Sequence, residues 1–172
     1  TASYEPTVAT DICGLQRGPD GCIYGATIIS MHIFRFDPRA RKLEDLGKVG
    51  WRGGEIYDVV ACGDKVYMGS YGGGYFAAYD PSQPWNPRPE EGGEHPEANP
   101  RNFGQLGDNM NRPFEYTVGP DGRIYIACRA NYHMPGGGLA RFDPETEEKA
   151  VFRDVDQAVQ SVASDATWVY GG

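Results

Sequence analysis

The chain consists of short runs in which apolar and polar residues alternate, separated by turn residues. Between 114 and 153 the alternation is visible over 114–119 and 123–128, and a third and a fourth strand are expected at 138–143 and 149–153. A period of two is typical of strands with one face buried, and no stretch has the 3.6-residue period of an amphipathic helix. The pattern therefore predicts an all-β protein with almost no helix.

A local motif returns four times along the chain. The copies are DGCIYGAT at 20–27, GDKVYMGS at 63–70, DGRIYIAC at 121–128 and DATWVYGG at 165–172. An aromatic residue followed by Asp-Pro comes after the first three copies, at 36–38, 79–81 and 142–144. The Asp-Gly pair suits a hairpin turn, and proline ends a strand because it cannot donate to the ladder. The repeat period of roughly 43 to 58 residues is that of four-stranded propeller blades.

These motifs resemble the blades of β-propeller repeat proteins, and are similar to those of extracellular bacterial propellers that handle polysaccharides, some of them lyases or glycosidases. The resemblance implies an all-β propeller segment of four-stranded antiparallel blades, three complete and a fourth begun, in one partial domain over 1–172. We expect the blades at about 11–47, 57–107, 114–155 and 159–172. It also implies an extracellular or periplasmic location.

Closed propellers have four to eight blades, so this number of blades leaves open strand edges. We therefore expect a fragment of a six- to eight-bladed propeller. Two alternatives stay open, namely a half-propeller closed by a second copy of the chain and a self-standing open array.

Composition narrows the possible partners. The formal net charge is −8 and the positive residues are scattered, which argues against nucleic acid or an anionic membrane as a partner. The sequence contains no run of 18 apolar residues that would predict a membrane span, and no signal peptide is visible. The four cysteines form no Cys-x-x-Cys pair and have no histidine at ligand spacing. We expect free thiols, with a Cys13–Cys22 bridge as the alternative, and neither a metal nor a cofactor.

Propeller geometry places one set of loops around the central channel, where function is usually found. This set comprises the links from second to third strands and from each fourth strand to the next blade. The link over 129–137 is the longest of the first kind, which makes its side chains the best candidates. The candidate catalytic residues are Arg129, Tyr132 and His133, and the candidate binding residues are His32, Trp51, Arg52, Tyr71, Asn109, Asn111 and Arg112.

Aromatic rings, amides and arginines on one rim suit a sugar chain that carries carboxylates. The sequence thus predicts a propeller that recognises or cleaves a poly- or oligosaccharide, with an acidic, uronate-containing polysaccharide as the expected substrate. An elimination would need a base, for which His133 or Tyr132 is suitable, and a cation for the developing enolate, for which Arg129 or Arg112 is suitable. The alternative is a non-catalytic ligand- or protein-binding propeller with the same rim.

The link between third and fourth strands of the second repeat is enlarged. Residues 82–102 are rich in proline, glycine and glutamate, which predicts an irregular inserted loop on the face opposite the channel rim. Its His95 has no companion ligands nearby in the sequence, so we expect no metal there.

Overall fold

The computed structural model describes residues 11–29, 31–49, 54–88, 95–153 and 157–172, and every regular element in these ranges is a β-strand. Three four-stranded antiparallel sheets follow one another, each with its strands in chain order, and a two-stranded sheet ends the chain. Blade 1 has β1 (Ile12–Arg17), β2 (Ile23–Thr27), β3 (His32–Asp37) and β4 (Lys42–Lys48); blade 2 has β5 (Val59–Cys62), β6 (Lys65–Ser70), β7 (Tyr75–Tyr79) and β8 (Arg101–Gln105); blade 3 has β9 (Arg112–Val118), β10 (Ile124–Arg129), β11 (Gly137–Phe142) and β12 (Lys149–Phe152); and blade 4 has β13 (Val162–Ser164) and β14 (Val169–Gly171).

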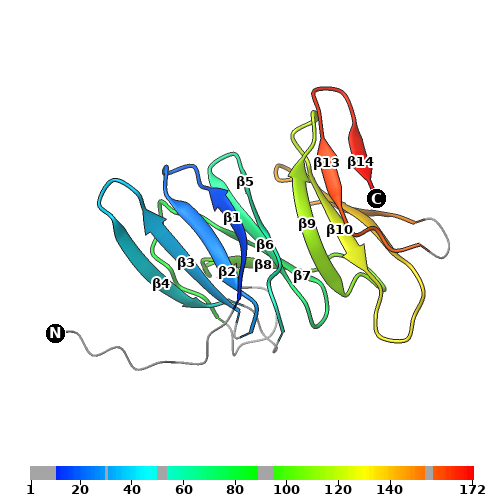
Figure 1. Cartoon of the computed structure of the whole chain (residues 1–172), viewed down its shortest axis with the longest axis horizontal. Coiled ribbons are helices and arrows are strands. Elements are labelled where there is room, and N and C mark those ends of the chain that lie inside the picture. The colour runs from blue at the N-terminus through cyan, green and yellow to red at the C-terminus, as the bar shows by residue number, and fades with distance from the viewer. Residues whose placement is uncertain (1–10, 30, 50–53, 89–94, 154–156) are drawn as a thin grey trace.

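The sheets stand next to one another with their first strands in contact. β1 contacts β5, β5 contacts β9, and β9 contacts β13, while the later strands of each sheet fan outwards (Figure 1). First strands at the centre and fourth strands at the outside are the arrangement of propeller blades. The all-β propeller segment with four-stranded antiparallel blades is therefore confirmed.

The hydrophobic core lies between the blades. Tyr24 and Ile33 of blade 1 pack with Met68 of blade 2 in one cluster, and Phe76 of blade 2 packs with Phe142 of blade 3 in a second. Apart from Met68, which is 1% exposed, these side chains are fully buried. Because each blade uses one sheet face against the preceding blade and the other against the following one, the alternating pattern produces a core on both faces.

In blades 1, 3 and 4 the recurring tyrosine is fixed by an aspartate of the hairpin turn. The hydroxyl of Tyr24 donates to Asp20 (2.9 Å), and the same bond recurs from Tyr125 to Asp121 (3.0 Å). In blade 4 the hydroxyl of Tyr170 donates to an aspartate of its own turn (2.7 Å). These bonds join the turn to the second strand of the same blade.

Acidic side chains on the first strands or just before them join neighbouring blades. A carboxylate oxygen of Asp58, which precedes β5, accepts the Tyr116 amide of the next blade (3.1 Å), and its other oxygen accepts the Val59 amide (2.8 Å). Glu115 on β9 does the same for the Val162 amide of blade 4 (2.9 Å). Burial raises the pKa of Asp58 to about 6, although the two amides act in the opposite direction.

The enlarged link connects β7 to β8. Its described part contains a bridge between Asn86 and Asn99, and Trp85 packs edge-on against the Tyr79 ring (5.0 Å between centroids). β8 begins at Arg101, so the last two residues of the segment expected to be irregular, Arg101 and Asn102, lie in a strand instead. The aromatic and backbone contacts at its ends fix this link to the blade.

All four cysteines are free thiols, so the alternative of a Cys13–Cys22 bridge does not occur. Within the described ranges, no helix is long and apolar enough to cross a membrane.

Candidate functional site

Two arginines face each other at one end of blade 3. Arg112 is the first residue of β9, Arg129 is the last residue of β10, and they are direct partners in the antiparallel register. Like charges directly opposite each other destabilise a strand pair. Neither guanidinium forms an ion pair with any residue that the structure describes. The two arginines are therefore cross-strand neighbours without a counter-charge among the described residues.

Aromatic rings hold these guanidinium groups in place. The Arg112 guanidinium lies 4.4 Å from the Tyr71 ring centroid and 4.8 Å from that of Tyr132, and it donates to the Tyr71 hydroxyl (3.1 Å). The hydroxyls of the two tyrosines hydrogen-bond to each other. Arg129 lies 4.9 Å from the Phe114 ring centroid. We call Tyr71, Arg112, Arg129, Tyr132 and His133 the arginine rim.

The loop that carries Tyr132 and His133 is fixed by Asn109. The Asn109 side chain donates to the Pro135 carbonyl (3.1 Å) and accepts the Asn131 amide (2.9 Å). Asn109 itself has φ 57°, a left-handed conformation that asparagine adopts more readily than most residues. Both ends of its amide thus contact the loop backbone, and its role here is to position the loop.

A hollow of about 350 Å³ lies beside the loop, lined among others by Arg112, Arg129, Asn131, Tyr132 and His133. Tyr132 is 64% exposed, so much of its ring remains open to solvent. His133 has φ 61° and its ring lies 6.3 Å from that of Tyr132. In Figure 1 this loop, drawn in yellow between β10 and β11, is at the lower edge of the molecule together with the β6–β7 loop that carries Tyr71.

Other predicted site residues lie elsewhere or serve the scaffold. Nδ1 of His32 lies 2.9 Å from an Asp45 carboxylate oxygen within blade 1, and no contact with the arginine rim is found among the described residues. Asn111 is 8% exposed, and its backbone N–H donates to the Arg129 carbonyl (2.9 Å). Trp51 and Arg52 are outside the described residues.

The sequence did not single out Phe114, whose ring supports Arg129. Phe114 stacks on Tyr57 with 4.5 Å between centroids and an interplanar angle of 21°. It is the extra residue of a β-bulge, because the register passes from Glu115 opposite Ala127 to Pro113 opposite Cys128. A bulge redirects a side chain but has no sequence signal other than a break in alternation, so pattern analysis does not reveal it.

Within the described ranges, no group of three or more histidine, cysteine, aspartate or glutamate side chains has the geometry of a metal site. The chemistry that the arginine rim offers is two cations, two phenols and one imidazole around an open hollow.

No protein-family model and no curated protein matches the chain. The solved structure of the PQQ-bound form of an aldose sugar dehydrogenase from Streptomyces coelicolor is similar, with a TM-score of 0.50 and 21% sequence identity. The match covers 81% of this chain and 47% of that one, so the chain spans about half the length of its solved neighbour. The fold is a β-propeller. At this level of identity the likeness concerns the fold alone.

Proposed function

We propose that the arginine rim binds an acidic oligo- or polysaccharide through a sugar carboxylate. The observation that carries this proposal is the cross-strand pair of Arg112 and Arg129 without an anionic partner among the described residues. A carboxylate between the two guanidinium groups would relieve their repulsion and accept charge-assisted hydrogen bonds from both. The planar guanidinium forks are preorganised by the rings on which they stack, which lowers the entropy lost on binding.

The neutral part of the ligand has suitable partners beside the arginines. The exposed ring of Tyr132 offers an apolar surface for the C–H face of a pyranose, and the Asn131 side chain offers an amide to its hydroxyls. The blade motifs resemble those of polysaccharide-handling propellers, and the similar solved structure is that of a sugar dehydrogenase. Both support a carbohydrate as the class of ligand.

The proposal extends to cleavage by elimination at a uronate. His133 or Tyr132 would remove the proton from the carbon next to the carboxylate, and its electron pair would form a C=C bond as the glycosidic C–O bond breaks and the leaving oxygen takes up a proton. Arg129 and Arg112 would stabilise the charge that develops on the carboxylate. The second candidate is a non-catalytic propeller in which the rim only binds its ligand, which the exposed position of Tyr132 equally favours.

The test is calorimetric titration with a galacturonate trisaccharide and with a neutral galactose trisaccharide of the same length. We expect the acidic sugar to bind more tightly, and Arg129→Gln to weaken its binding about tenfold or more, because hydrogen bonds to charged groups contribute roughly 1.5 to 3 kcal/mol. Arg123→Gln is the matched control, because Arg123 is paired with Asp121 and Asp143 at the other end of β10. Equal affinity for the two sugars would refute the proposal.

The same samples separate the two candidates. Elimination creates an unsaturated uronate that absorbs at about 235 nm. A rise in absorbance that disappears in His133→Ala or Tyr132→Phe supports the lyase, and saturable binding without it supports the non-catalytic propeller. PQQ belongs in the titration as well, because it is a planar carboxylate whose binding at the rim would point to redox chemistry instead.

A further inference from the structure

Blade 2 lacks the bond between tyrosine and turn aspartate that the other blades have. In blades 1 and 3 the aspartate lies four residues before the tyrosine, but in blade 2 that position is Gly63 and the aspartate, Asp64, comes one residue later. Tyr67 is nevertheless only 3% exposed, and its hydroxyl forms no hydrogen bond with any residue that the structure describes. Although the ring is buried, the hydroxyl oxygen is not closed off from solvent, so it is open to a hydrogen-bonding partner from outside the protein.

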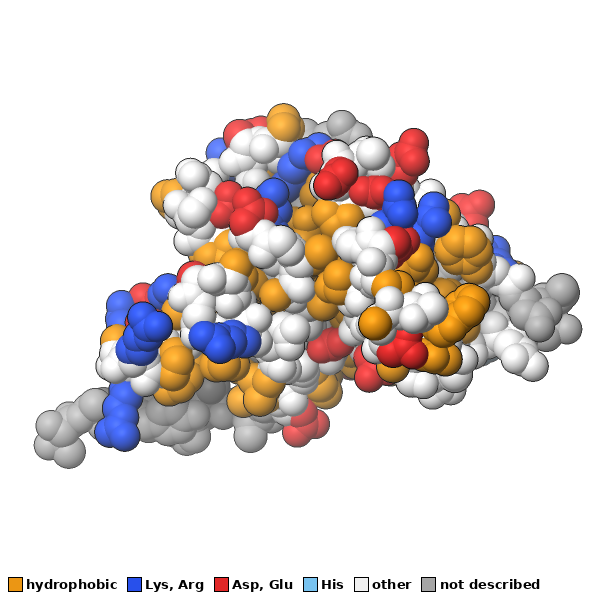
Figure 2. Space-filling view, turned by 90° about the horizontal axis from the view of Figure 1, so that it is seen from above, with side chains coloured by type: hydrophobic (Ala, Val, Ile, Leu, Met, Phe, Trp, Pro, Cys, Tyr) orange, Lys and Arg blue, Asp and Glu red, His pale blue; other side chains and the backbone are white. Residues whose placement is uncertain are grey.

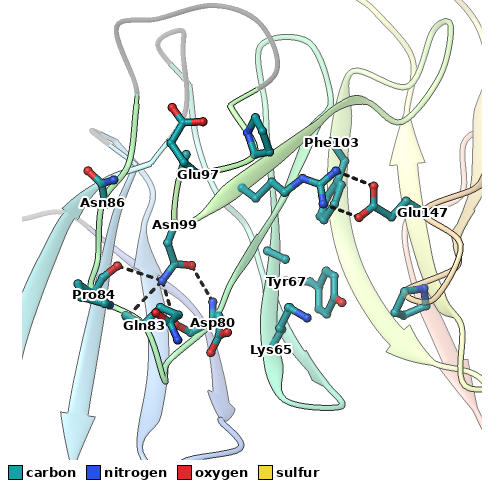
Figure 3. A pocket seen from close by; sticks show the side chains of 15 residues that line it. Lys65, Tyr67, Asp80, Gln83, Pro84, Asn86, Glu97, Asn99, Phe103 and Glu147 are labelled. Carbon is teal, nitrogen blue, oxygen red and sulfur yellow. Dashed lines mark hydrogen bonds and ion pairs between the residues drawn. The ribbon is translucent and has the colours of Figure 1, made fainter.

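Blade 2 also differs from the other blades in its enlarged β7–β8 link, which lies at the same end of the sheet as the β5–β6 turn. The turn ends where β6 begins, at Lys65, and the link starts where β7 ends, at Tyr79. The described part of that link encloses a hollow of about 390 Å³ against the blade, which is within the usual range of small-molecule sites. Lys65, Tyr67, Asp80, Asn86 and Phe103 are among its lining residues (Figure 3).

We propose that this hollow is a second ligand site, specific for a neutral sugar, on the propeller face opposite the arginine rim. The hydroxyl of Tyr67, at the end of a buried ring, would be its central hydrogen-bond donor. Nothing in this proposal depends on the ligand of the rim.

Both hydrogen-bond donors and hydrogen-bond acceptors surround the hollow. Burial raises the pKa of Tyr67 well above its ordinary value, so its hydroxyl keeps its proton and can donate. Lys65, two residues before it on β6, lies on the same face of the strand and adds a second donor. Asp80 accepts from Ser82 through one carboxylate oxygen only, and the other oxygen has no donor among the described residues. Sugar hydroxyls both donate and accept, which matches this mixture.

The charges around the hollow disfavour an anion. The carboxylates of Asp80, Glu97 and Glu147 outnumber the cations of Lys65 and Arg101 along its walls. Arg101 is moreover neutralised by a bidentate pair with Glu147 (2.6 and 2.7 Å), which Figure 3 shows at one side of the hollow. Seen from above, the molecule shows both acidic and basic side chains, with several lysine and arginine side chains gathered at the lower left of the view (Figure 2).

Apolar groups complete the walls. Phe103 contributes an aromatic ring, and alanine and proline side chains cover much of the remaining surface, namely Ala78, Pro84, Pro96, Ala98 and Pro144. Rigid apolar walls with a few directed polar groups are the usual construction of a small-molecule site, and they suit the C–H faces of a pyranose. Asn99 fixes the link over the hollow, since its amide donates to the Asp80, Gln83 and Pro84 carbonyls (2.9, 3.2 and 3.1 Å).

The first experiment is calorimetric titration of the protein with glucose, galactose, maltose and galacturonate, each to about 50 mM, which detects dissociation constants in the millimolar range. We expect saturable binding of at least one neutral sugar. Tyr67→Phe should weaken it roughly three- to tenfold, the effect of losing one hydrogen bond. Tyr125→Phe is the matched control, because it removes the equivalent hydroxyl from blade 3 and should leave the affinity unchanged. Absence of neutral-sugar binding, or equal weakening by both variants, would overturn the proposal.

The second experiment needs no ligand and tests whether the hydroxyl is free within the protein. Thermal unfolding of Tyr67→Phe should show a nearly unchanged midpoint, because the variant removes a hydroxyl that has no hydrogen-bond partner among the described residues. Tyr24→Phe should unfold at a lower temperature, because it loses the bond to Asp20. If the two variants lose equal stability, the Tyr67 hydroxyl has a partner within the protein and the site loses its central donor.

Discussion

Arg112 and Arg129 face each other as cross-strand partners at the end of blade 3. Aromatic rings contact both guanidinium groups, and no carboxylate among the described residues pairs with either of them. Like charges opposite each other destabilise a strand pair, and in the proposed function an anion between the two groups would relieve this repulsion. Binding sites commonly combine such locally unfavourable features with a well-packed scaffold.

Arg112→Lys tests whether the stacked geometry matters in addition to the charge. Lysine keeps the charge, but it cannot stack between the Tyr71 and Tyr132 rings or form a bidentate contact with a carboxylate. We expect the affinity for a galacturonate oligosaccharide to fall at least about fivefold, measured by calorimetry. Arg141→Lys is the control, since Arg141 lies over the Phe152 ring away from the rim and should not affect binding. A variant with wild-type affinity would show that charge alone is sufficient.

Asn109→Ala should loosen the loop over 130–136. The variant loses the bonds to the Pro135 carbonyl and the Asn131 amide, and alanine is also strained at φ 57°. We expect exchange of the Asn131 amide to accelerate about fivefold or more, measured by hydrogen-exchange NMR. Asn109→Gly separates the two causes, because glycine tolerates the conformation but also lacks the amide. Unchanged exchange in both variants would contradict the positioning role.

Asp58 should make stability fall as the pH rises from about 4 to about 6.5. Its pKa is raised from 3.8 to about 6, so the folded state prefers the protonated form, and this contribution is complete below pH 3.8 and is lost as pH rises through 6. The loss is about 1 to 3 kcal/mol, from 1.36 kcal/mol per pKa unit. Urea unfolding at pH 4.5 and 6.5 measures it, and the decrease should be smaller in Asp58→Asn. Parallel pH profiles of the two proteins would show that Asp58 titrates normally.

Asp20→Asn should destabilise blade 1. Burial acts to raise the pKa of Asp20, but hydrogen bonds from the Cys22 amide, Arg35 and Tyr24 outweigh it and the pKa is lowered. Replacing this carboxylate removes charge-assisted bonds, and we expect a loss of about 1 to 3 kcal/mol in unfolding free energy at pH 7. Because the pKa is lowered, the loss should shrink as the pH falls below the ordinary aspartate value. Asp64→Asn, at the turn of blade 2 where the tyrosine bond is missing, should change stability by less than about 0.5 kcal/mol.

The blades could be predicted because their determinants are local. Alternation over 123–128, the Pro120-Asp121-Gly122 turn and the Asp-Pro after the third strand each act within a few residues, and the repeat multiplies the signal. The long loop over 129–137 was also visible as a difference between repeats. The candidate residues within that loop, Tyr132 and His133, line the hollow beside Arg129.

Other predictions depended on contacts that a pattern does not contain. Asn109 has a side-chain amide of the kind that binds sugar hydroxyls, yet this amide hydrogen-bonds to the loop backbone instead. Asn111 is buried. His32 lies beside Asp45 of its own blade. A polar residue near a rim can face a ligand, a neighbouring loop or the sheet itself, and only packing decides among these.

The sequence by itself determined the strands, the turns and the radial repetition, because a period of two and Asp-Gly turns impose their geometry on adjacent residues. The tertiary structure decided which side chains meet. A bulge at Phe114 shifts the register so that Arg112 lies opposite Arg129, and a one-residue displacement of the turn aspartate leaves the Tyr67 hydroxyl without its partner. Both depend on register and on packing between blades, where a shift of one residue exchanges one set of neighbours for another.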